Sequence, residues 1–255
     1  METLILHRTS KDNVGDYYSN PSLYFEFPNV TVNDITKKNN VENKFTIVGG
    51  GGLIHPRFSL FLKKVSKKSN MSVLWGVGHN YNPKMKKGND IPLYPKWIKN
   101  FNLVGIRDHI NLDLYLPCAS CMHPAFDKTY DVTNDVVYFL HAHKSKGIVV
   151  DHVPVMYNDQ MDIYKVIEFL GSAKTVVTNS YHGAYWSMLL GKSVNTTSWS
   201  TKFEHFKYPP HFLKKITDTP NDQCTVSKNY LSECRNLNKE FYKKVLLLIE
   251  QGSIK

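Results

Sequence analysis

The stretch TVVTNSYHGAYWSMLLGKSV, residues 175–194, decides the fold class of this chain. It begins with a short apolar run, Thr175–Val177, which is typical of a strand buried on both faces. Residues 179–190 open with Asn-Ser, two residue types that favour the position before a helix, and they predict a turn followed by a helix. Lys192–Val194 then begins another strand. This order of strand, helix and strand is the repeating unit of a parallel α/β sheet.

Short apolar runs separated by segments of helix length recur on both sides of this stretch. The further expected strands are Thr3–His7, Phe45–Val48, Ser72–Trp75, Leu103–Ile106, Val136–Leu140 and Gly147–Val150. The further expected helices cover residues 58–67, 162–171 and 232–251. Continuous apolar strands that alternate with helices predict an α/β fold with parallel sheets.

A polar, turn-rich stretch at residues 127–134 lies between two sets of these strands and predicts a domain boundary. We therefore expect a Rossmann-like domain over residues 1–130 and a second one, which includes the terminal helix, over residues 131–255. The two halves are expected to face each other across a cleft in a GT-B-like arrangement. The final helix can then cross back to the first half.

The 255-residue chain has the composition of an ordinary soluble globular protein, with 42% hydrophobic and 21% charged residues. None of its apolar runs approaches the ~18 residues that a membrane helix needs. The first residues, Met1–Leu4, lack a basic segment followed by an apolar one, so we do not expect a secretory signal. A cytoplasmic location is the resulting expectation.

The net charge of +10 comes mainly from lysine, because the chain has only four arginines, Arg8, Arg57, Arg107 and Arg235. Such an excess can be a solvated surface, or it can attract anionic substrates or the anionic inner face of a membrane. Nucleic acid is not an expected partner, because the sequence lacks zinc-finger spacing, an RNP-type aromatic motif and a basic recognition helix. The oligomeric state stays open.

Four cysteines are present, of which Cys118 and Cys121 form a Cys-x-x-Cys pair. Cys224 and Cys234 are spaced too widely to be the second half of a usual zinc knuckle. Without a secretion signal, the thiols are expected to be reduced. We therefore predict no metal site.

Polar or glycine-rich tips follow each of the four strands expected in the first half. They are Asn13–Asp16, Gly49–Gly52, Gly76–Asn80 and Arg107–Asp108. Ligands of open parallel sheets bind beyond the carboxyl ends of the strands, so we expect these tips to border one site. The glycine run lets backbone N–H groups approach an anion, although the same run can be only a tight turn. It fits neither a Walker A motif nor a dinucleotide fingerprint, so a nicotinamide cofactor is not expected.

In the second half, His182 is predicted to lie in the first turn of the helix that follows the buried strand. The N–H groups at a helix N-terminus, here including those of Tyr181 and Gly183, bind phosphate or carboxylate groups. His182 can alternatively be a histidine satisfied within the core. We interpret the strand-to-helix position as favouring an anion site.

In their order along the chain, these motifs resemble those of the polysaccharide pyruvyl transferase family. The Asn-x-Gly-Asp step of the family is matched by residues 13–16, its Gly-Gly-Gly turn by 49–52 and its Gly-x-Gly turn by 76–78. The segment with Arg-Asp is matched by 106–108, and the late Thr-x-Ser-aromatic-His-Gly segment by 178–183.

The matches extend from residue 13 to about residue 194, and three positions depart from the family pattern. Many members have arginine where this chain has Ser180. His123 replaces the aspartate of an Asp-Pro-Ala step in the family, and Ser193 replaces the proline of a Gly-x-Pro step that is matched by residues 191–193. These departures affect the assignment of the phosphate-binding arginine more than they affect the resemblance to the family.

The resemblance implies transfer of the enolpyruvyl group of phosphoenolpyruvate to two hydroxyls of a sugar, forming a ketal in polysaccharide or glycan biosynthesis. It implies no cofactor beyond the donor, and a glycan acceptor that can be lipid-linked. Asp16 is then the candidate base, and His182 the candidate acid or phosphate donor. The implied substrate-binding residues are Arg8, Asn13, Gly15, Gly50, Gly51, Gly52, Gly78, Arg107, Asn179, Ser180, Tyr181, Gly183 and Lys202.

Other interpretations of the same residues stay open. Asp16 also fits a loop Asx-turn, and Arg107 an ion pair with Asp108. A nucleotide-sugar glycosyltransferase would use similar glycine turns and helix N-termini, but the sequence offers no clear acidic clamp for a ribose. A non-catalytic sugar- or anion-binding protein on the same scaffold is the alternative from another class, and a zinc-stabilised structural protein is more remote.

Overall fold

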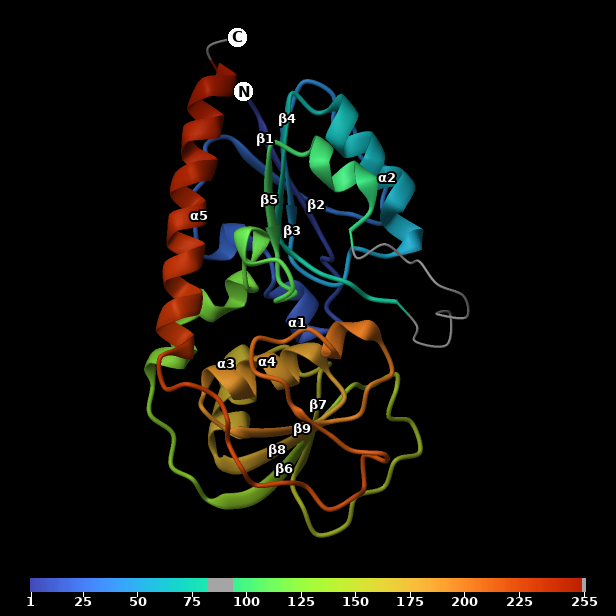
Figure 1. The fold of residues 1–255 in the computed structure, drawn as a ribbon, viewed down its shortest axis with the longest axis vertical. Coiled ribbons are helices and arrows are strands. Elements are labelled where there is room, and N and C mark those ends of the chain that lie inside the picture. The colour runs from blue at the N-terminus through green and yellow to red at the C-terminus, as the bar shows by residue number, and fades with distance from the viewer. Residues whose placement is uncertain (82–93, 254–255) are drawn as a thin grey trace.

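The computed structural model describes residues 1–81 and 94–253 and contains two five-stranded parallel sheets (Figure 1). The first sheet has the order β2-β1-β3-β4-β5, and the second has the order β10-β9-β8-β6-β7. The first is built from β1 (Thr3–His7), β2 (Val30–Asp34), β3 (Phe45–Gly49), β4 (Met71–Val77) and β5 (Leu103–Ile106). The second is built from β6 (Asn134–Leu140), β7 (Val155–Tyr157), β8 (Ala173–Thr178), β9 (Ser193–Thr196) and β10 (His211–Phe212). The expected α/β fold with parallel, Rossmann-like sheets is confirmed.

Helices connect these strands. The α-helices are α1 (Val14–Tyr17), α2 (Pro56–Lys68), α3 (Ile163–Gly171), α4 (Tyr181–Leu189) and α5 (Tyr230–Ser253). Short 3₁₀ helices are η1 (Pro21–Leu23), η3 (Lys96–Asn100), η4 (Leu112–Leu114), η5 (Ala119–Met122), η6 (Pro124–Asp127) and η7 (Thr201–Phe203). Strands β1 and β3 are buried at every position, as continuous apolar strands covered on both faces should be. Within the described residues, no helix combines the length and the apolar character needed to cross a bilayer.

One predicted strand is wrong. Residues 147–150 form no strand, because the backbone of Gly147 adopts a φ of +81° and Val149 is 72% exposed. The edge position beside β6 is taken instead by β7, a three-residue strand that follows Pro154. Strand β2, also not predicted, is exposed at four of its five positions and so lacks the continuous apolar run of the inner strands.

Packing crosses the predicted domain boundary in both directions. Helix α5 runs along the first sheet (Figure 1), where Phe241 and Val245 join the same apolar cluster as Trp75. The Trp75 indole N–H also donates a hydrogen bond to Oδ1 of Asn238 in α5, at 2.9 Å. Conversely, η5 and η6 contribute Cys121 and other side chains to the core that is built around α3 and α4. The boundary near residue 130 stays a prediction.

Helix α1 joins the two halves. Val14 belongs to the core of the second half, and its N–H donates to the carbonyl of Asn158, at 2.8 Å. Because the short segment of residues 8–13 links α1 to the carboxyl end of β1, this contact brings the end of the first sheet up to the second half.

Candidate active site

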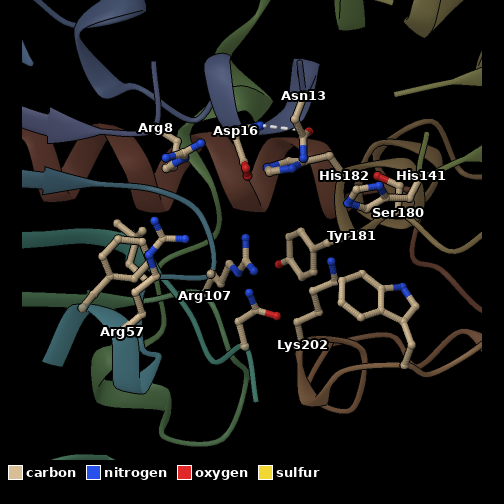
Figure 2. Close-up of a pocket in the computed structure, with 15 residues that line it drawn as sticks. Arg8, Asn13, Asp16, Arg57, Arg107, His141, Ser180, Tyr181, His182 and Lys202 are labelled. Carbon is tan, nitrogen blue, oxygen red and sulfur yellow. Dashed lines mark hydrogen bonds between the residues drawn. The ribbon is translucent and has the colours of Figure 1, made fainter. Parts of the chain in front are cut away.

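A cavity of about 250 Å³ lies where the two halves meet (Figure 2). We call it the central pocket. Its lining residues are Arg8, Asn13, Asp16, Gly52, Leu53, Arg57, Phe58, Asn80, Arg107, His141, Ser180, Tyr181, His182, Trp199 and Lys202. Ligand pockets for drug-sized molecules usually occupy ~300–1,000 Å³, so this volume suits a small molecule or one part of a larger one.

Asp16 enters the pocket from α1 because Asn13 fixes the start of that helix. The Asn13 side-chain oxygen accepts hydrogen bonds from the N–H groups of Gly15, at 3.1 Å, and Asp16, at 3.4 Å. Burial raises the pKa of the Asp16 carboxyl, and the charges of Lys202, Arg107 and Arg8 oppose that rise. A carboxylate whose pKa lies above its usual value is a better proton acceptor near neutral pH.

Three of the four arginines of the chain line the central pocket. Arg107 is the most buried of them, with 4% of its surface exposed, and its guanidinium carbon lies 3.5 Å from the centre of the Tyr181 ring. Its buried Nε has no hydrogen-bond partner among the described residues. Gly78 permits this placement, because a Cβ atom there would lie 2.5 Å from that Nε.

The other two arginines lie toward the outer side of the pocket. Arg8 follows β1, and its Nη1 is 3.8 Å from Oδ1 of Asp34, a carboxylate already held by Thr9 and Thr36. Arg57 lies in the first turn of α2 and is exposed. In Figure 2 the labelled side chains of Arg8, Arg57 and Arg107 all extend into the same space.

Lys202 completes the set of cations. It lies in η7, is 9% exposed, and its Nζ sits 4.0 Å from the ring centre of Trp199. Burial and the nearby charge of Arg107 lower the pKa of Lys202 to about 7, while Asp16 opposes the shift. An ammonium group with this pKa can give or take a proton at neutral pH.

His182 lies where it was predicted, in the first turn of α4, but it is nearly fully buried. Its Nε2 is 3.5 Å from Sγ of Cys118, and its ring packs against Gly15, where a Cβ would lie 2.0 Å from Nδ1. Burial, together with Arg107 and Lys202, lowers the pKa of His182 well below its usual value. The imidazole is therefore neutral near pH 7, which fits a hydrogen-bonding role and disfavours a protonated acid.

Several predicted binding residues support the pocket without lining it. The side-chain oxygen of Asn179 accepts hydrogen bonds from the N–H of His141, at 2.7 Å, and from the Ser145 hydroxyl, at 3.3 Å, so this amide braces the loop after β6. Gly183 packs against Phe139, which leaves no room for a side chain. The remaining predicted residues outside the lining are Gly15, Gly50, Gly51 and Gly78.

The sequence interpretation missed four charged or aromatic residues of the pocket, Arg57, Phe58, His141 and Trp199, and expected Asn80 there only as part of the tip Gly76–Asn80. Asn80 directly follows the Gly-x-Gly-His tip of β4, and its Oδ1 accepts a hydrogen bond from Ser200, at 2.8 Å. The rarity of arginine in this lysine-rich chain was a usable signal for Arg57. His141 and Trp199 carry no such signal, because only the fold brings them together.

No cysteine lines the central pocket among the described residues, although Cys118 contacts His182 from behind it. Cys118 and Cys121 are buried and form no disulfide, and burial raises the pKa of both thiols. Over residues 1–81 and 94–253, no group of three or more His, Cys, Asp or Glu side chains is arranged to hold a metal ion.

No family model matches the chain, and no curated protein matches it in sequence. Among solved structures, an uncharacterized protein from Klebsiella pneumoniae subsp. pneumoniae is similar, with a TM-score of 0.48 and 17% sequence identity. The similarity covers 84% of this chain and 93% of that protein. Nothing about function follows from a similarity of this size.

Proposed function

We propose that this protein is a pyruvyl transferase that moves the enolpyruvyl group of phosphoenolpyruvate onto two hydroxyls of a sugar. The observation that carries the proposal is the charge of the central pocket. Arg8, Arg57, Arg107 and Lys202 converge on one small cavity in which Asp16 is the one carboxylate that the described residues contribute. Phosphoenolpyruvate presents a phosphate and a carboxylate on a three-carbon skeleton, so it matches a compact pocket with several cations and one base.

The reaction requires a proton to be added to the methylene carbon of the donor and a proton to be removed from each of the two sugar hydroxyls. Protonation of the methylene carbon of phosphoenolpyruvate makes C2 electrophilic, and a sugar hydroxyl adds to C2 as it loses its proton to a base. Phosphate then leaves as the C2–O bond breaks, and the second hydroxyl adds to C2 and loses its proton. The products are inorganic phosphate and a ketal that carries the methyl and carboxylate groups of pyruvate.

Two groups in the pocket suit the proton transfers. Lys202, with a pKa of about 7, can donate the proton to the methylene carbon. Asp16, whose pKa is raised by burial, can accept the proton of the attacking hydroxyl. The neutral imidazole of His182 and the first-turn N–H groups of α4 can then hydrogen-bond the leaving phosphate.

Arg107 is the candidate clamp for the donor. Its guanidinium is buried, oriented over the Tyr181 ring, and retains an unpartnered Nε among the described residues. Such a fork binds phosphate or carboxylate in two-point geometry. In this proposal the two sheets form a GT-B-like pair, with the donor held in the cleft between them and the acceptor entering from the open side.

The direct test is incubation with phosphoenolpyruvate and a panel of lipid-linked or p-nitrophenyl glycosides. We expect phosphate release together with a glycoside whose mass has increased by one pyruvate ketal. Phosphate release without the mass change would indicate a phosphatase instead. No reaction across the panel, with no binding of phosphoenolpyruvate, would overturn the proposal.

Thermal stability distinguishes this function from a nucleotide-sugar glycosyltransferase. A ligand that binds only the folded state raises the free energy of unfolding, by about 2.7 kcal/mol at a ligand concentration of 100 times its Kd. The melting temperature rises as a consequence. We expect phosphoenolpyruvate to raise Tm and nucleotide sugars to leave it unchanged. The reverse result would favour the glycosyltransferase.

A further inference from the structure

The outward face of α2 is a continuous basic stripe. Arg57, Leu60, Lys64 and Lys67 follow one another at spacings of three or four residues, and Lys68 lies four residues after Lys64, so all five lie on one side of the helix. All five are exposed, whereas Leu62 and Val65, on the opposite side, are fully buried against the first sheet. We call these five residues the basic face.

The charge of the basic face is poorly balanced. Residues 56–68 contain one arginine and four lysines but no aspartate or glutamate. One weak contact, 3.9 Å between Nζ of Lys68 and Oε1 of Glu42, is the only ion pair that the described residues make with α2. The adjacent η3, which packs against α2 through Trp97 and Ile98, adds two exposed lysines at positions 96 and 99.

An exposed leucine lies within this charge. The side chain of Leu60 is 84% exposed, more than any other large hydrophobic side chain among the described residues. A basic surface with an apolar residue at its centre suits the interface of an anionic bilayer, where lysines meet lipid headgroups and the leucine enters the acyl boundary. Nucleic acid would use the lysines but would give no reason for an exposed leucine.

The basic face also borders the central pocket. Arg57 and Phe58, in the first turn of α2, line the pocket together with Tyr181 and His182 from α4. In Figure 1, α2 lies on the outer side of the first half, opposite α5. A surface bound to the first turn of α2 would therefore lie beside the central pocket.

We propose that α2 docks the protein on an anionic phospholipid membrane through the basic face, so that acceptors reach the pocket from the bilayer. The docking itself stands on the charge and exposure of α2. The identity of the acceptor as a lipid-linked glycan rests on the proposed function. The protein can therefore fail to bind vesicles and still catalyse pyruvyl transfer, or bind vesicles without catalysing it, and the two measurements distinguish these cases.

The test is co-sedimentation with vesicles of phosphatidylcholine alone or mixed equally with phosphatidylglycerol. We expect binding only to the anionic vesicles, and loss of that binding at high salt, where the surface potential is screened. Replacement of Lys64, Lys67 and Lys68 together by glutamate should weaken binding by at least ~100-fold, because each lysine near the surface contributes about fivefold. Leu60→Gln should weaken binding further without changing the net charge.

A matched control lies on the opposite side of the molecule. Replacement of Lys239, Lys243 and Lys244 of α5 by glutamate changes the net charge by the same amount, and these side chains are also exposed. This variant should retain most of the vesicle binding, and circular dichroism should show that both triple variants stay folded.

Three results would overturn the proposal. Equal loss of binding in both triple variants would indicate a general effect of net charge. Equal binding to neutral vesicles would exclude electrostatic docking. The third result is tighter binding of the protein, through the basic face, to a mixed-sequence RNA duplex than to anionic vesicles at the same salt concentration. It would assign this surface to nucleic acid.

Discussion

The central pocket and the basic face of α2 share Arg57 but present positive charge in two different ways. The pocket collects three of the four arginines and one lysine, with Arg107 and Lys202 almost completely buried. The basic face consists mainly of lysines that are open to solvent. Arginine holds a planar fork in fixed geometry, whereas lysine carries a flexible, hydrated point charge.

Burial decides what a cationic cluster can do. In the pocket, desolvation changes proton affinities, lowering the pKa of Lys202 and raising that of Asp16. The basic face contains no carboxylate and lies in water, so it can attract anions but offers no proton acceptor. In the proposed function, Asp16 is therefore the group that distinguishes the pocket from a surface that only binds anions.

Removing that carboxylate charge should have the largest effect. Asp16→Asn should lower turnover by about 10²–10⁴-fold, because the pocket loses the proposed general base. The affinity for phosphoenolpyruvate should stay the same or increase, since a negative charge near the donor is lost. Steady-state kinetics and a calorimetric Kd measure the two effects separately. Weakened donor binding with intact turnover would contradict the assigned role.

Replacing Arg107 by lysine makes the cations of the pocket more similar to those of the basic face. Arg107→Lys keeps the charge but removes the fork, and should raise the KM for phosphoenolpyruvate by about 10–100-fold. Arg235→Lys is the matched control, because Arg235 lies outside the pocket and donates to the carbonyl of Cys121, at 2.9 Å. An unchanged KM in Arg107→Lys would mean that charge alone suffices.

The third prediction concerns pH. The pKa of Lys202 lies at about 7, so the ammonium form is present below that pH and is lost as the pH rises through it. If Lys202 donates the proton, kcat/KM should fall about tenfold per pH unit above pH 7. Lys202→Arg should have low activity and lack this inflection. A wild-type profile that stays flat up to pH 9 would exclude Lys202 as the donor.

The smallest effect is on stability. The pKa of Lys202 in the folded state lies below that of an exposed lysine. Burial of the charged side chain therefore lowers the free energy of unfolding, by its full amount below pH 7 and by less as the pH rises toward 10. Lys202→Met should therefore stabilise the fold at pH 6 by about 1–2 kcal/mol while activity is lost. Lys64→Met, on the exposed face of α2, should change Tm very little. A lower Tm for Lys202→Met would show that its contacts outweigh the desolvation cost.

The sequence predicted the inner strands well because their signal is local. Continuous apolar runs identified β1, β3 and β8, and the Asn-Ser pair marked the start of α4. The signal was misleading at residues 147–150, where an apolar run follows Gly147 but does not pair with a neighbouring strand. Exposed or very short edge strands such as β2 and β10 carry too few buried positions to be recognised.

The sequence by itself determined the parallel α/β class and the polar strand ends that carry Asp16 and Arg107. Only the tertiary structure decided the chemistry of these groups, because proton affinities depend on burial and on charges distant in sequence. Lys202 lies 186 residues from Asp16 in the chain, yet each shifts the pKa of the other. The sequence correctly placed His182 in the first turn of α4, but its ring is kept neutral by burial, to which the packing of Gly15 contributes, and by the charges of Arg107 and Lys202.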